Sequence, residues 1–265
     1  MTGGTDIDDP AVSRFVFHPR PEGFAESTSA LETTTRTTDG AAVCGWLHPN
    51  ETSDTLMLFF HGNGEIASDY AALAHLYTGC GVWFWVVDYR GYGKSSGSPS
   101  FSRMLTDAEA LLDDVPAAEA AAGRRFSKII VMGRSLGSAS AIHLAATRLD
   151  RLHGLVLDSP FADGPALIRR LGGPEVDLHL TPGFIGNLER MKACRLPALI
   201  IHGTADWIIP VSDAEALYRA CPGAQKRFVK IPGAGHNDLL MLGFETYFSE
   251  IRSLVESIHP AGRTP

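Results

Sequence analysis

One pentapeptide, residues 133–137, has the pattern Gly-x-Ser-x-Gly and is the clearest indication of chemistry in the chain. It follows the mostly apolar run 128–132 and precedes the helix-forming run 138–146. A serine on a sharp strand-to-helix turn needs a strained backbone and small residues on either side, which the two glycines supply. Such a turn lifts the Ser135 hydroxyl above the sheet and places the Leu136 N–H at a helix N-terminus. The pattern therefore predicts that Ser135 is a nucleophile.

A nucleophilic serine needs a general base, and the base needs an acid that orients it. Two later segments supply these side chains. Asp206 ends the segment His-Gly-Thr-Ala-Asp, just after an apolar run, and His236 stands in the loop after the last such run. Both positions are carboxyl ends of predicted strands, where open α/β sheets build their sites. We expect His236 to take the Ser135 proton and Asp206 to hold the imidazole.

An acyl-transfer site also needs donors for the negatively charged oxygen that forms on the carbonyl group. The loop His-Gly-Asn-Gly at 61–64 follows the apolar run 56–60 directly. We expect the backbone N–H groups of Asn63 and Leu136 to form this oxyanion hole, and such donors are worth several kcal/mol.

The elements that must position these residues alternate between strand and helix. Strands are predicted at 56–61, 82–89, 128–133, 152–157, 198–202 and 227–231, and helices at 68–77, 103–114, 138–146, 212–220 and 244–258. Two earlier strands, 33–37 and 42–48, flank the turn-forming pair Asp39-Gly40. The pattern predicts a single α/β domain over residues 14–265. Its central sheet is mostly parallel, with an antiparallel N-terminal hairpin and helices on both faces.

Two segments fall outside this alternation. Residues 1–13 are polar and aperiodic, which predicts a disordered tail, and residues 15–17 are expected to form an edge strand. Residues 159–195 are rich in proline and glycine, which predicts a small cap insertion near the site. The apolar residues of the cap either line an acyl-binding site or pack its underside. They are Phe161, Leu167, Ile168, Leu171, Leu178, Leu180, Phe184 and Ile185.

Composition excludes several classes of protein. With 265 residues, 45% of them hydrophobic and 20% charged, the chain has the composition of an ordinary soluble globular protein. A formal net charge of -7 argues against nucleic-acid binding. No apolar run is long enough to span a bilayer, and the first residues lack the features of a signal peptide. Four scattered cysteines and no zinc-binding pattern favour a cytoplasmic protein without a metal or an organic cofactor.

In their order along the chain, these motifs resemble those of the α/β-hydrolase superfamily. The matching segments are 61–63, 88–95, 133–137, 202–210 and 233–238, and the resemblance extends over about residues 30–258. The chain is most similar to the BEM46-like group, which includes the ABHD17-type protein depalmitoylases. Residues 1–43 contain no cysteine, so the lipid-anchored form of such an enzyme is not expected. The resemblance implies the triad Ser135, Asp206 and His236.

Two side chains near the motifs are open to other roles. Asp158 also ends a predicted strand, and some superfamily members take their acid from that strand, so it is an alternative to Asp206. We favour Asp206 and expect Asp158 to brace loops through hydrogen bonds. Arg134 stands between Gly133 and the nucleophile, and we expect it to pair with a nearby acid, either Glu65 or Asp158.

The expected activity is that of a serine hydrolase, a carboxylesterase or thioesterase acting on a small-molecule or acyl substrate. A prolyl-type peptidase or amidase on the same triad is an alternative. It would need cap carboxylates to recognise a free amine, and Asp163, Glu175, Asp177 and Glu189 are available. A non-catalytic binding scaffold is a second alternative, which the complete triad disfavours.

Overall fold

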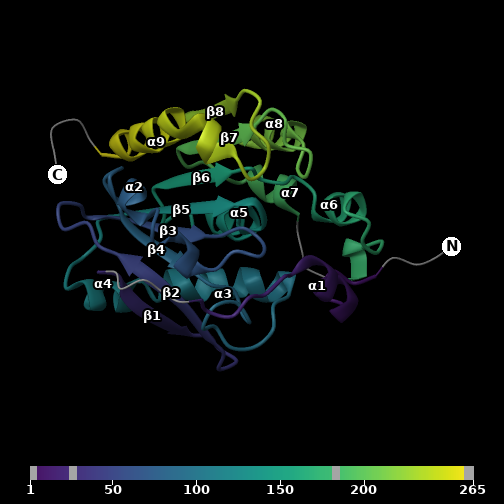
Figure 1. Ribbon diagram of the computed structural model, residues 1–265, viewed down its shortest axis with the longest axis horizontal. Coiled ribbons are helices and arrows are strands. Elements are labelled where there is room, and N and C mark those ends of the chain that lie inside the picture. The colour runs from purple at the N-terminus through teal and green to yellow at the C-terminus, as the bar shows by residue number, and fades with distance from the viewer. Residues whose placement is uncertain (1–4, 24–28, 181–185, 260–265) are drawn as a thin grey trace.

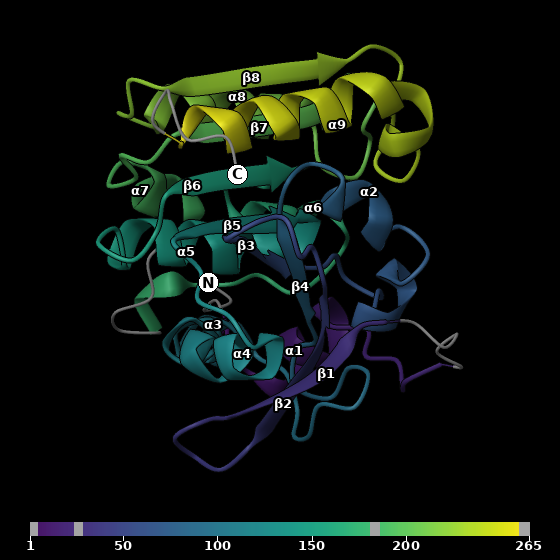
Figure 2. The same cartoon turned by 90° about the vertical axis from the view of Figure 1, so that its left-hand side faces the viewer.

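The computed structural model describes residues 5–23, 29–180 and 186–259, and an eight-stranded sheet forms its centre. The sheet has the order β1-β2-β4-β3-β5-β6-β7-β8, with β8 at the top of Figure 2 and β1 and β2 at the bottom. The strands are β1 (Leu31–Arg36), β2 (Ala42–His48), β3 (Thr55–Phe60), β4 (Trp83–Val87), β5 (Lys128–Arg134), β6 (Gly154–Asp158), β7 (Ala198–Gly203) and β8 (Lys226–Ile231). β2 is antiparallel to β1 and β4, and the remaining neighbours are parallel. The predicted fold class is confirmed.

Helices cover both faces of this sheet (Figure 1). In the described ranges the α-helices are α1 (Pro10–Val16), α2 (Ala74–Thr78), α3 (Phe101–Asp113), α4 (Val115–Ala122), α5 (Ser138–Thr147), α6 (Gly164–Arg170), α7 (Asn187–Met191), α8 (Val211–Ala220) and α9 (Leu239–Ser257). Short 3-10 helices are η1 (Ala67–Tyr70), η2 (Ser135–Gly137) and η3 (Leu178–Leu180). Residues of α3, α5 and α8 belong to one core cluster, and residues of α2 and α9 belong to the other. No helix in the described part of the chain is both long and apolar enough to cross a bilayer.

The two core clusters meet at the central strands, and β3 shows how. Leu56, Leu58 and Phe60 face the cluster on one side of the sheet, while Met57 and Phe59 face the other. Successive side chains of a strand point to opposite faces, so a strand covered on both sides must be apolar at every position. This explains the uninterrupted apolar runs in the sequence. The carboxyl ends of β3 to β8 lie at one edge of the sheet because these strands are parallel.

The N-terminal segment differs from the sequence-based prediction. Residues 5–13 are ordered: Ile7 and Val12 are fully buried, and Thr5 pairs with Val176 of the cap. The prediction of a disordered tail over residues 1–13 was therefore wrong for this part, and residues 1–4 lie outside the described residues. Two isolated apolar residues in a polar segment carry no periodic signal, so only docking against the domain reveals their burial.

The predicted edge strand at 15–17 was also wrong, because Phe15 and Val16 belong to helix α1. The Asp9 side chain accepts a hydrogen bond from the Ala11 N–H at 2.7 Å, and Pro10 occupies the first helical position. Aspartate followed by proline is a common helix start, and here it outweighs the β-propensity of the aromatic and branched residues.

Other differences concern short helices. The helix predicted at 68–77 is divided into η1 and α2, and α4 follows α3 without having been predicted. The cap segment 159–195 connects β6 to β7 and contains α6, η3 and α7. Figure 1 shows α1 and α6 at the right, beyond the arrowheads of the central strands, so both border the edge where the predicted site residues lie.

Candidate active site

Ser135 occupies a strained turn between β5 and α5. Its φ is +50°, which places a non-glycine residue in the left-handed region. A Cβ on Gly133 would lie 2.3 Å from the Gly137 carbonyl oxygen, and a Cβ on Gly137 would lie 2.1 Å from that of Phe60. Both positions thus require glycine, as the sequence predicted. The close packing of Gly137 on Phe60 also sets the turn beside the loop that follows β3.

Ser135, His236 and Asp206 form a hydrogen-bonded row. The distance from Ser135 Oγ to His236 Nε2 is 2.8 Å, and that from His236 Nδ1 to Asp206 Oδ2 is 2.7 Å. A carboxylate can only accept, so Nδ1 is the donor to Asp206 and Nε2 is left to accept from the serine hydroxyl. His236 and Asp206 are both buried. The three side chains come from loops after β5, β8 and β7, and the structure brings them together at one edge of the sheet.

Asp206 is held as an anion. Its Oδ1 accepts hydrogen bonds from the N–H groups of Ile208 and Ile209, at 2.9 and 2.8 Å. Burial favours the neutral acid, but hydrogen bonds from His202, His236 and the Ile209 N–H outweigh burial and keep the pKa of Asp206 well below its usual value. His202 is fully buried and its Nε2 donates to the Ile209 carbonyl at 2.8 Å. An ionised Asp206 can orient His236 and stabilise its protonated form.

Asp158, the alternative acid, binds other groups. Its carboxylate accepts hydrogen bonds from Tyr247 Oη at 2.9 Å and from Ser159 Oγ at 2.8 Å. No hydrogen bond joins it to His236 within the described residues. Ser159, with a φ of +49°, is the other described non-glycine residue with a positive φ. Asp158 therefore has a bracing role through hydrogen bonds, as expected, but it braces the end of β6 against α9 and not one loop against another.

The loop after β3 lies beside the Ser135 turn, and its Asn63 side chain makes contacts that the sequence did not suggest. Asn63 Nδ2 donates to the Val16 carbonyl at 2.5 Å, and Oδ1 accepts from the His18 N–H at 3.0 Å and from Tyr92 Oη at 2.8 Å. The residue predicted to supply an oxyanion donor is thus anchored to the segment that ends α1. Sequence reasoning missed Tyr92 and the N-terminal segment, because neither shows a pattern that links it to Asn63.

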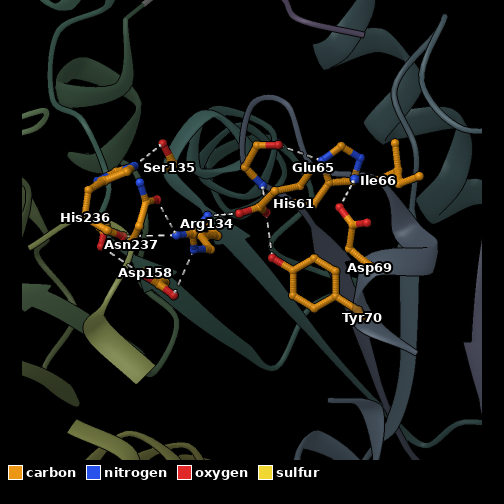
Figure 3. Close-up of polar contacts among 12 residues, drawn as sticks. His61, Glu65, Ile66, Asp69, Tyr70, Arg134, Ser135, Asp158, His236 and Asn237 are labelled. Carbon is orange, nitrogen blue, oxygen red and sulfur yellow. Dashed lines mark hydrogen bonds and ion pairs between the residues drawn. The ribbon is translucent and has the colours of Figure 1, made fainter. Parts of the chain in front are cut away.

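Arg134 pairs with both of the acids that the sequence offered (Figure 3). Its Nη1 forms an ion pair with Glu65, and its Nε lies 3.7 Å from Asp158 Oδ2. Its Nη2 also donates to the His236 carbonyl oxygen at 3.0 Å and to Asn237 Oδ1 at 3.3 Å. The contact with the histidine loop had no signal in the sequence.

The apolar cap residues divide between packing and exposure. Phe161 and Ile168 are buried in the main core cluster, and Leu167 packs against it. Leu171 and Leu180 are about half exposed. Phe184, Ile185 and the side chain of Leu178 lie outside the described residues. At least part of the cap therefore packs its apolar side chains against the core of the domain.

Comparison with known proteins identifies the family of the chain. A family model described as Hydrolase_4, serine aminopeptidase S33, matches residues 51–178 and 179–241. Protein bem46 of Schizosaccharomyces pombe is 30% identical over 227 residues, which cover 83% of this chain and 74% of that protein. An uncharacterised protein of Mycobacterium tuberculosis is 32% identical over 249 residues, which cover 90% of this chain and 85% of that protein.

Solved structures share the fold. The Pyrococcus furiosus esterase Pf2001 superposes with a TM-score of 0.73 at 19% identity, covering 91% of this chain and 99% of the esterase chain. Est1E from Butyrivibrio proteoclasticus superposes with a TM-score of 0.69 at 18% identity, covering 87% and 99%. At these identities the likeness shows the fold alone. Together with the family match and the curated relatives, it shows that the chain belongs to the serine aminopeptidase S33 family of hydrolases, as a BEM46-like member of the α/β-hydrolase superfamily.

Proposed function

We propose that this hydrolase cleaves carboxylic ester or thioester bonds through an acyl-enzyme formed on Ser135. The observation that carries the proposal is the row Ser135–His236–Asp206, with distances of 2.8 and 2.7 Å, on a strained turn. A serine whose hydroxyl already donates to an oriented imidazole is the arrangement that activates it as a nucleophile.

In the proposed reaction, Ser135 Oγ bonds to the substrate carbonyl carbon while its proton moves to His236 Nε2. The N–H groups of Asn63 and Leu136 stabilise the resulting oxyanion. The bond to the leaving group then breaks, and His236 returns the proton to the departing alcohol or thiol. A water molecule, deprotonated by His236, then attacks the acyl carbon. The bond between that carbon and Ser135 Oγ breaks, His236 returns the proton to Ser135 Oγ, and the acid is released. Asp206 stays ionised and stabilises the imidazolium, and the cycle requires neither a metal nor an organic cofactor.

A peptidase reaction is the second candidate, because the matched family is described as serine aminopeptidase. Recognition of a free amine would need an available carboxylate in the cap, but each of the four acids considered already binds a partner within the cap. The pairs are Asp163 with the Ala166 N–H, Glu175 with Arg169, Asp177 with the His179 N–H and Glu189 with Lys192.

The test is intact-mass analysis after treatment with a fluorophosphonate, on the wild type and on Ser135→Ala. We expect one covalent adduct on the wild type and none on the variant. A folded wild type that forms no adduct would contradict the proposal and favour a binding scaffold. The rates of turnover of short-chain esters, acyl thioesters and aminoacyl-nitroanilides would show which bond the enzyme cleaves fastest. Faster cleavage of the nitroanilides would favour the peptidase.

The substrate class and the location complete the proposal. We expect a small-molecule or acyl ester or thioester as substrate, no nucleic-acid partner and no stable membrane insertion. A cytoplasmic location remains a prediction from the sequence, and fractionation of cells that express the protein would test it.

A further inference from the structure

We propose that Arg134 is a positioning residue, whose guanidinium holds the oxyanion loop and the histidine loop in place on either side of Ser135. The inference rests on the proposed function and deepens it. Arg134 is the last residue of β5, directly before the nucleophile, and its side chain is only 15% exposed. In Figure 3 it lies between Glu65 on one side and Asp158 and Asn237 on the other.

On the oxyanion side, Arg134 acts through Glu65. The Glu65 Oε1 atom pairs with Arg134 Nη1, and its Oε2 accepts from the Gly62 N–H and from Tyr70 Oη, both at 2.7 Å. Gly62 immediately precedes Asn63, whose N–H is the proposed oxyanion donor. The carboxylate therefore closes the turn that aims this donor, and the arginine holds the carboxylate.

Gly62 gives independent evidence that this arrangement is tightly packed. A Cβ at Gly62 would lie 2.8 Å from Arg134 Nη1 and 3.0 Å from Glu65 Oε2. The ion pair thus lies directly against the backbone of the oxyanion loop, and a side chain at Gly62 would displace the ends of Arg134 and Glu65.

On the histidine side, Arg134 binds the backbone of the proposed base. Its Nη2 donates to the His236 carbonyl oxygen at 3.0 Å, so the residue is held at two points. Asp206 orients the ring and Arg134 fixes the main chain. A guanidinium presents several donors in a rigid plane and can bind Glu65 and His236 at once, whereas a single ammonium group cannot match that geometry.

A cavity beside Arg134 explains why polar contacts, and not side-chain packing, must hold the two loops in place. A cavity of about 260 Å³ lies against Arg134, lined also by Glu65, Tyr70, Asp158 and Asn237. Side-chain packing therefore does not close the space between the two loops on this side. Small displacements of reacting groups are expensive, since an error of about 1 Å can cost about 100-fold in rate.

The experiment is a double-mutant cycle with Arg134→Met and Glu65→Gln, assayed by ester turnover in the whole chain. We expect Arg134→Met to lower kcat by about 10- to 100-fold with little change in KM, because the loss falls on the transition state. Glu65→Gln should lower kcat in the same sense. Because both act through one bridge, the double variant should be little worse than the poorer single variant. If the losses in the logarithm of kcat are additive, the proposal that Arg134 and Glu65 act through one ion pair is overturned.

Arg134→Lys separates positioning from charge neutralisation, and it keeps the test decisive if Arg134→Met fails to fold. We expect the lysine variant to keep its thermal midpoint but to recover little of kcat. Full recovery would show that a positive charge suffices and would overturn the inference. Arg148→Met is the matched control, since Arg148 pairs with Asp113 on the surface, and it should leave kcat unchanged.

The two proposals fail in different ways. A folded wild type that neither binds the fluorophosphonate nor turns over esters would overturn the proposed function, and this inference with it. A wild type that does both, with an Arg134→Met variant of equal kcat, would overturn the role of Arg134 alone.

Discussion

Asp206 Oδ2 lies 2.7 Å from His236 Nδ1, although 30 residues separate the two along the chain. Asp158, one strand away, binds Tyr247 and Ser159 instead. This difference predicts a ranking of two asparagine variants. Asp206→Asn should lower kcat by about 10³- to 10⁴-fold, because an amide can favour the wrong imidazole tautomer. Asp158→Asn should chiefly lower stability, by about 1 to 3 kcal/mol, because it weakens buried hydrogen bonds.

Ester turnover and urea unfolding of both variants would check this ranking. A larger loss of kcat in Asp158→Asn than in Asp206→Asn would contradict the assignment of the acid.

The turn that carries Ser135 predicts a steric effect. Gly137→Ala would place a Cβ 2.1 Å from the Phe60 carbonyl oxygen, which belongs to a central strand and cannot move aside. We expect a loss of at least about 3 kcal/mol, or no folded protein at all. In β6, Gly154→Ala meets only side-chain atoms of Ile130 and Leu254, at 3.5 Å or more, which are ordinary contacts, and should change stability by less than about 1 kcal/mol. Urea unfolding of the pair measures the difference, and equal stabilities would refute the steric argument.

The buried Arg90 and the exposed Arg125 should differ in how much each contributes to stability. Arg90 donates to both oxygens of Asp107, at 2.6 and 2.8 Å, and also to Asp39 at the tip of the β1–β2 hairpin. Removing it leaves the buried Asp107 without its cation, so Arg90→Met should cost about 3 to 5 kcal/mol. Arg125 pairs with Glu119, but its side chain is 87% exposed. Arg125→Met should therefore cost less than about 1 kcal/mol. Thermal or urea unfolding gives both values, and a comparable cost for the two would argue against the buried network.

His48 predicts how stability depends on pH. Its Nε2 is buried without a hydrogen-bond partner among the described residues, and burial lowers its pKa to about 4. Between its usual pKa near 6.5 and pH 4, the unfolded chain binds a proton that the folded chain does not. Stability must therefore fall as pH falls through this window, by on the order of 1 to 3 kcal/mol from this residue.

His48→Leu should flatten the decline between pH 6.5 and 4, as measured by urea unfolding at several pH values. The exposed His75 serves as control, and His75→Leu should retain the wild-type slope. Unchanged slopes in both variants would assign the acid sensitivity to other groups.

Much of the architecture could be predicted because its signals are local. The runs at 56–60 and 128–133 are apolar at almost every position, which is what a strand covered on both faces requires. Gly133 is needed because its backbone closely approaches Gly137 of the same motif, whereas Gly137 is needed because of its contact with Phe60 on β3. Ser135, Asp206 and His236 each follow a strand, which places all three at the edge that the carboxyl ends of the parallel strands share.

The sequence by itself therefore determined the sheet, the turn that carries Ser135 and the set of side chains near its edge. Only the tertiary structure decided which of them meet: that Asp206 and not Asp158 reaches His236, that Arg134 binds Glu65 and the His236 backbone, and that α1 holds Asn63. The physical reason is distance along the chain. Periodicity and turn preference arise from neighbours a few residues apart, whereas hydrogen bonds between loops depend on how separate strands are aligned by the packing of the whole core.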